Sequence, residues 1–150
     1  MKRIALFLLM MSLFLCAEKL EITADKFIAK DADKKVSFIG HAKIVQGATT
    51  VKAPKIILYF NEDNSTKMYK ALDGVQFHIQ KRRANYQGSC NTMEYLPKKK
   101  KYILSGDVKV KDRSNRRDIT ANRIEIHSKT GAFSIEGSKK RAAKLIFEMK

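Results

Sequence analysis

The stretch Ile119-Thr120-Ala121-Asn122-Arg123-Ile124-Glu125-Ile126 decides the fold, because three other segments repeat its pattern. The other copies begin at Ile22, Val51 and Gly88, so that successive copies lie 29, 37 and 31 residues apart. Each copy has a small residue at its third place, then a polar or turn-forming pair, then an apolar residue. A fixed period of about 30 residues is typical of one supersecondary unit stacked on copies of itself, which builds an elongated body with one apolar seam.

Alternation of apolar and polar residues predicts that these units are β-strands with one buried face. In Ser105–Lys111 two valines share one face and the charged side chains the other. Within Ile119–Ile126 the apolar positions change face across Asn122, and Pro54 holds the matching place in the second copy. Proline in sheets is confined to edges, bends and bulges. We therefore expect each copy to be a strand that bends in its middle.

A second series supports a ribbon that folds onto itself. Glycines at positions 40, 74, 106 and 137, each two places after an apolar residue, follow one another at steps of 34, 32 and 31. We interpret them as bulges or corners within strands. Polar, turn-forming segments fall between the strands, at residues 61–65, 97–101, 112–117 and 128–131. The sequence shows no linker, so we expect one domain over residues 18–150.

The N-terminus has the features of a secretory signal. Met1-Lys2-Arg3 precedes an apolar run over 4–15, and polar sequence begins at Glu18. We predict a signal peptide over residues 1–17, cleaved after Ala17. A retained membrane anchor is the alternative, although a span needs about 20 apolar residues. Lipid attachment at Cys16 fits less well, because the bulky Leu15 precedes it.

The predicted mature chain is basic and has one cysteine. The formal net charge of the full chain is +16, and loss of the signal removes two bases. Cys90 has no partner for an internal disulfide, so stability must come from packing and backbone pairing. Export weighs against a nucleic-acid partner. The basic segments 81–83 and 98–101 are interpreted as solvated loops, with attraction to anionic lipid headgroups as the alternative.

Taken in order, these motifs resemble the LptA/OstA family of periplasmic lipopolysaccharide-transport proteins. The resemblance covers nearly the whole predicted mature chain, and Cys90 and Pro54 are departures from the family pattern. The segments that carry it are residues 22–26, 40–47, 51–53, 104–110 and 119–124.

The resemblance implies an all-β fold, namely an elongated, open, twisted antiparallel β-jellyroll. It implies an apolar groove that holds the acyl chains of lipid A. It also implies a head-to-tail homo-oligomer that bridges inner-membrane and outer-membrane transport components of the same β-jellyroll fold. Two alternatives stay open: an LptC-like, membrane-anchored component of the same pathway, and a secreted β-solenoid scaffold that binds no lipid.

The candidate lipid-binding residues are the apolar side chains on the inward faces of the predicted strands. A packed core is the simpler explanation for each residue taken singly, and an open groove would leave part of this surface for a ligand. The candidates are Leu20, Ile22, Phe38, Ile44, Ile56, Leu58, Phe77, Met93, Tyr95, Val108, Ile124, Ile126 and Phe133.

Catalysis and metal binding are not expected. The three histidines, at positions 41, 78 and 127, are far apart in sequence, whereas zinc sites need clustered ligands. Cys90 takes the small place of the repeat, and no nucleophile elbow, phosphate loop or carboxylate pair accompanies it. We predict no cofactor and no enzymatic activity. Residues 20–26 and 143–148 are expected to form the two opposite edges through which copies pair.

Overall fold

The computed structural model describes residues 19–81 and 84–149, and the predicted signal peptide over 1–17 lies outside them. Twelve strands form one antiparallel sheet. No helix in this part of the chain is long and apolar enough to cross a membrane. The strands are β1 (Leu20–Thr23), β2 (Lys26–Lys30), β3 (Lys35–Gln46), β4 (Thr49–Phe60), β5 (Thr66–Leu72), β6 (Val75–Lys81), β7 (Ala84–Cys90), β8 (Thr92–Leu96), β9 (Lys101–Asp112), β10 (Arg117–His127), β11 (Phe133–Glu136) and β12 (Lys144–Phe147).

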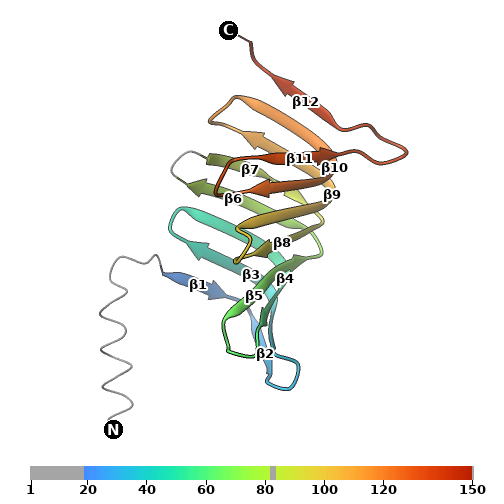
Figure 1. Ribbon diagram of the computed structural model, residues 1–150. Coiled ribbons are helices and arrows are strands. Elements are labelled where there is room, and N and C mark those ends of the chain that lie inside the picture. Colours follow the sequence, from blue (N-terminus) through green and yellow to red (C-terminus); the bar gives the residue numbers. More distant parts are fainter. Residues whose placement is uncertain (1–18, 82–83, 150) are drawn as a thin grey trace.

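The strands bend where the repeat predicts. The long strands β3, β4, β9 and β10 each span both sides of a bend, and each of the pairs β1/β2, β5/β6, β7/β8 and β11/β12 spans one in the same way. Register shifts mark the bends between Ile39 and Ala42 and between Ala121 and Arg123. The bent strands follow one another as an up-and-down ribbon (Figure 1).

Bending folds this ribbon into two layers that meet along the line of bends. Layer 1 contains β1, β6, β7 and β12 with residues 42–46, 49–53, 108–112 and 117–121 of the long strands. Layer 2 contains β2, β5, β8 and β11 with residues 35–39, 55–60, 101–105 and 123–127. The turns lie along the margins of the layers that are farthest from the bends. We call this margin lip 1 in layer 1 and lip 2 in layer 2.

The same local geometry makes the bend at Asp25 and at Asn91. Asp25 N–H donates to the Gly40 carbonyl at 2.8 Å, and Asn91 N–H donates to the Gly106 carbonyl at 2.9 Å. Gly106 has a φ of +78°, which a residue with a Cβ adopts only with strain. A Cβ there would also lie 2.6 Å from the nitrogen of the Asn91 side-chain amide. The glycine series predicted in the sequence therefore falls at corners of the fold.

The core lies between the two layers. Inward residues of every strand except β2 and β12 form or pack against one apolar cluster that includes Ile56, Phe77, Leu104 and Ile124. β1 and β12 lie at opposite ends of layer 1, and β2 and β11 at opposite ends of layer 2 (Figure 1). The molecule thus has a long apolar interior, a closed spine of bends and two open edges in each layer.

Candidate functional site

The interior between the layers is the candidate functional site, and all thirteen predicted residues point into it. Seven are buried: Ile56, Leu58, Phe77, Met93, Val108, Ile124 and Ile126. Five are partly buried and pack against these: Ile22, Phe38, Ile44, Tyr95 and Phe133. Leu20 is 39% exposed and lines the same interior near its N-terminal end. The structure therefore brings the predicted set together on one continuous surface.

The interior is filled mainly by the protein's own side chains. Between Leu20 and Tyr102 it holds an apolar cavity of only about 50 Å³. For comparison, an apolar cavity of about 150 Å³ can bind benzene. Apolar side chains of both layers therefore pack against one another in this part of the interior.

A row of tyrosines lies in the interior of layer 2 and was missed by the sequence reasoning, except for Tyr95. The rings of Tyr95 and Tyr102 stack with their centroids 4.4 Å apart, and Tyr69 lies 5.9 Å from Tyr95. Burial raises the pKa of the Tyr95 and Tyr102 phenols above its ordinary value. The cross-strand pairs Tyr69–Tyr95 and Tyr95–Tyr102 could be found only once the strand register was known.

A buried ion pair within layer 1 contacts layer 2 near the C-terminal end of the interior. The Asp112 carboxylate is 1% exposed and accepts hydrogen bonds from Asn115 and from the Arg117 guanidinium. That guanidinium also lies over the Phe133 ring of layer 2, 4.6 Å from its centroid. Asp112 continues the inward alternation of Val108 and Val110, which is the signal that could have placed it inside. The residues were predicted only as part of a polar turn.

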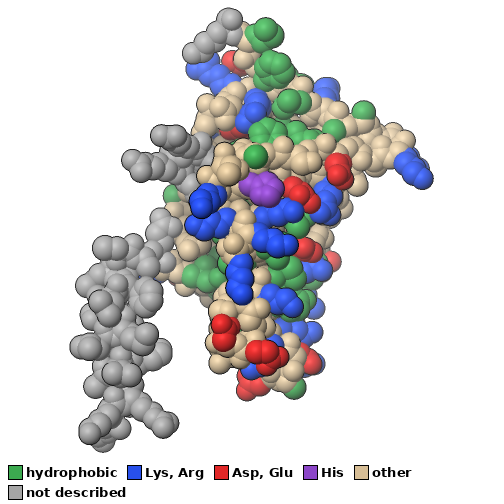
Figure 2. All heavy atoms as spheres, viewed as in Figure 1, with side chains coloured by type: hydrophobic (Ala, Val, Ile, Leu, Met, Phe, Trp, Pro, Cys, Tyr) green, Lys and Arg blue, Asp and Glu red, His purple; other side chains and the backbone are tan. Residues whose placement is uncertain are grey.

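Large apolar side chains are exposed at the two ends of the molecule. At the N-terminal end Phe27 is 57% exposed and its ring contacts Phe38, with centroids 5.1 Å apart. At the C-terminal end Leu145, Ile146 and Phe147 of β12 are exposed. Figure 2 shows this apolar group at the end that carries β12, with acidic side chains at the opposite end. Both groups belong to edge strands, which leave backbone groups unpaired.

The described part of the chain has one free cysteine, Cys90. Cys90 is a buried free thiol that donates to the Thr92 carbonyl at 3.3 Å, and burial raises its pKa to about 12. It fills the small place of the repeat, as predicted. Within residues 19–81 and 84–149 no three His, Cys, Asp or Glu side chains lie close enough to hold a metal ion.

Comparison with known proteins points in one direction. The fold matches the crystal structure of LptH, "the LptA homologous periplasmic component of the conserved lipopolysaccharide transport device from Pseudomonas aeruginosa". The TM-score is 0.76 at 10% identity, over 88% of this chain and 96% of that one. Curated protein sequences give no match. Residues 21–132 match the family described as "LptA/(LptD N-terminal domain) LPS transport protein". The match covers more than half of the chain, which therefore belongs to this family of lipopolysaccharide-transport proteins.

Proposed function

We propose that the protein is a periplasmic carrier that passes lipopolysaccharide from the inner to the outer membrane. Its acyl chains would lie between the two layers, against the inward apolar residues. The observation that carries the proposal is the one apolar interior that runs through all eight bent strands of a chain in this family. No chemistry on the lipid is needed.

Loading would require the layers to part at the lips, because the cavity of about 50 Å³ cannot hold an acyl chain. Burial of each methylene gains about 0.8 kcal/mol, so a chain of a dozen carbons gains on the order of 10 kcal/mol before ordering costs. That gain is large enough to displace contacts between the layers. Similar apolar sites along the interior would then let the lipid advance by exchange.

Site-specific photocrosslinking tests where the acyl chains lie. A photoreactive residue at Tyr95 faces the interior, and one at the neighbouring Glu94 faces outward from the same strand. We expect crosslinks to lipopolysaccharide from Tyr95, and also from Phe77, and few from Glu94. Equal yields from Tyr95 and Glu94 would mean that the interior is not the binding site.

We further propose that copies join head to tail through their edge strands. β12 of one copy would pair with β1 of the next, which would continue layer 1 and bring Leu145 and Phe147 against Leu20. Such heterologous contacts build filaments. The outermost copies would meet inner-membrane and outer-membrane components of the same β-jellyroll fold.

Charge substitution at the inward positions of β12 tests this assembly. We expect light scattering to show concentration-dependent oligomers of the unmodified protein, and Leu145→Asp with Phe147→Asp should abolish them. Ile146→Asp is the matched control, because Ile146 faces outward from the same strand. It should leave most of the assembly intact. Oligomers that persist in the double variant would exclude pairing through β12.

Export by a cleaved signal also remains a proposal, because residues 1–17 lie outside the described part of the chain. Mass spectrometry of protein from the periplasmic fraction should give a mature chain that begins at Glu18. A chain that keeps residues 1–17 in the membrane fraction would favour the anchored, LptC-like alternative.

A further inference from the structure

The outer face of layer 1 carries a group of cations that share one hollow surface. On layer 2 two outward cations share one carboxylate: Lys101 Nζ lies 2.8 Å from Glu125, and Arg123 Nη2 lies 2.7 Å from the same side chain. These partners hold the pKa of Glu125 down to about 2. On layer 1 five cations line the outer face: Lys43, Lys52, Lys109, Lys111 and Arg113. None of these five has a carboxylate within 4.0 Å among the described residues.

The strand register brings the cations of layer 1 into rows. Lys43 and Lys52 lie directly opposite each other on β3 and β4, and Gln76 of β6 follows in the same row. Ser89 of β7 and Lys109 of β9 complete it. Like charges directly opposite each other on adjacent strands destabilise a sheet. This arrangement therefore does not serve the stability of the fold and suits an anionic ligand instead.

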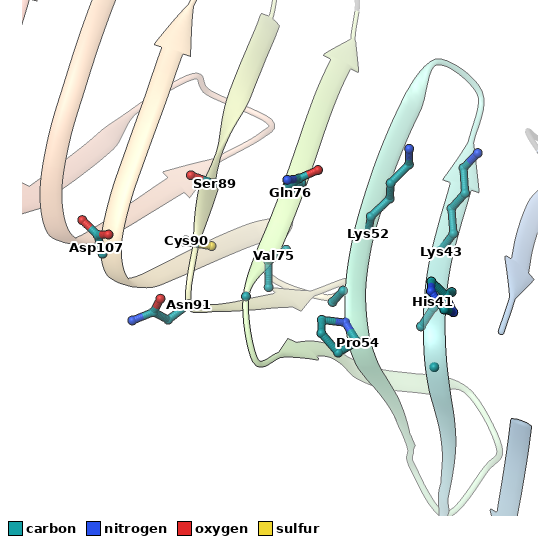
Figure 3. A pocket seen from close by; sticks show the side chains of 14 residues that line it. His41, Lys43, Lys52, Pro54, Val75, Gln76, Ser89, Cys90, Asn91 and Asp107 are labelled. Atoms are coloured by element: carbon teal, nitrogen blue, oxygen red, sulfur yellow. The ribbon is translucent and has the colours of Figure 1, made fainter. Parts of the chain in front are cut away.

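The rows line a hollow outer surface. Two adjoining hollows, of about 890 and 770 Å³, share Lys52, Gln76 and Ser89, and together they form what we call the basic groove. Figure 3 shows the Lys43 and Lys52 side chains side by side along one margin, with Gln76 and Ser89 on the next strands. Three strand spacings separate β4 from β9, so Lys52 and Lys109 stand about 14 Å apart across a neutral floor.

The chemistry of the basic groove fits a phosphorylated saccharide. Amides and hydroxyls of the floor, from Gln76, Gln87 and Ser89, match sugar hydroxyls, and the flanking lysines match phosphates. Two carboxylates, Asp107 and Asp118, also line the groove, which leaves an excess of three cations. None of the large exposed apolar side chains lines it, which disfavours insertion into a membrane, and it presents no exposed aromatic ring for base stacking.

We propose that the basic groove binds the phosphate-bearing saccharide of the lipopolysaccharide whose acyl chains lie between the layers. This inference rests on the proposed function and adds a second site to it. Arg113 lies in the turn after β9, on lip 1, and also lines the groove. A lipid held between the lips would leave its saccharide beside this turn, from which the outer face of layer 1 is directly reached. The acyl chains would then contact the inner face of layer 1, and the saccharide would contact its outer face.

Calorimetric titration with acyl-free phosphorylated oligosaccharide, obtained from lipopolysaccharide by complete deacylation in strong alkali, tests the groove alone. The groove variant is Lys52→Gln, Lys109→Gln and Lys111→Gln. The control variant, Lys30→Gln, Lys67→Gln and Lys129→Gln, loses the same charge at exposed positions outside the groove. We expect the groove variant to bind about tenfold more weakly or worse, the scale of one charge-assisted hydrogen bond, and the control to bind like the unmodified protein. Dephosphorylated oligosaccharide should bind as weakly as the groove variant binds the phosphorylated form.

Three results would overturn the inference: no binding to the unmodified protein, unchanged binding by the groove variant, or an equal loss in both variants. Displacement of an apolar dye by intact lipopolysaccharide separates this failure from failure of the proposed function. If lipopolysaccharide displaces the dye while the oligosaccharide does not bind, the interior site stands and the basic groove is excluded. If the dye is not displaced, the carrier function fails, and the oligosaccharide titration still decides whether the groove binds.

Discussion

The middle of the interior and its two ends are built from the same kinds of residue but differ in burial. Ile56 and Leu104 in the middle are fully buried, whereas Phe27 at one end and Phe147 at the other are 57% and 55% exposed. All four point inward from bent strands of the same design. The difference is that strands in the middle have neighbours on both sides and those at the ends have one. The ends therefore leave apolar side chains and backbone groups accessible to solvent, whereas the middle does not.

A charge placed in the middle should have the largest effect. Leu104→Asp puts a carboxylate among buried apolar side chains, which costs more than about 4 kcal/mol, a large part of the total stability of a typical domain. The matched change at the end, Phe147→Asp, should cost less than about 1 kcal/mol because the side chain stays in water. Urea denaturation followed by circular dichroism measures both. Similar losses at the two positions would contradict the contrast between middle and ends.

Removal of the Arg117 guanidinium should cause the second-largest loss of stability. Arg117→Met leaves the Asp112 carboxylate buried with Asn115 as its only remaining side-chain partner, at a cost of about 3 kcal/mol. It also removes the guanidinium from the Phe133 ring, so the layers should part more easily at the C-terminal end.

The double variant Asp112→Asn with Arg117→Met controls for the orphaned charge. It should regain most of the lost stability if the buried carboxylate causes the loss. Faster access of an apolar dye to the interior in the double variant than in the unmodified protein would show that the contact with Phe133 also holds the layers together. If Arg117→Met alone is as stable as the unmodified protein, the ion pair does not stabilise the fold.

Substitutions at the bends should lower the stability less. Two glycines distinguish the cost of the backbone conformation from the cost of a steric contact. Gly106 and Gly131 have nearly the same φ, +78° and +75°, but only Gly106 has a neighbour where a Cβ would go. Gly131→Ala should therefore cost about 1 kcal/mol for its backbone conformation alone. Gly106→Ala should cost more, because the Asn91 side chain must also move. Equal costs in thermal denaturation would mean that the close approach at the bend is unimportant.

The local features of the sequence predicted the bent strands and their inward faces. The change of phase at Asn122, the proline at 54 and the spaced glycines each act through neighbouring residues, so their consequences can be derived locally. The same holds for Cys90, whose small size matches its place in the repeat. All thirteen candidate residues point inward because alternation fixes the face once the bends are placed.

The distance between the layers and the basic groove could not be predicted in this way. How far the interior closes depends on packing between strands that are distant in sequence, and no single segment sets it. Lys52 and Lys109 each look like an ordinary outward lysine of a strand with one buried face. Only the register across four strands places them on opposite margins of one groove. The basic excess was instead attributed to turns.

The smallest expected effect is on the stability of the N-terminal bend, which differs from its counterpart in the middle. At the middle bend Asn91 packs against Gly106, and at the N-terminal bend Asp25 takes the same place and bonds His41 Nδ1 at 2.8 Å. That hydrogen bond, helped by the negative charge, raises the pKa of His41 above its ordinary 6.5. The pair therefore adds stability below about pH 6.5, and this contribution is lost as the pH rises through the raised pKa. Both side chains are exposed, so salt should weaken the effect.

Titration of the His41 ring by NMR should show the raised pKa. The Asp25→Asn variant should return this pKa toward 6.5 without unfolding the bend, because asparagine already occupies the equivalent position 91. An unchanged His41 pKa in Asp25→Asn would show that the contact with Asp25 does not raise it.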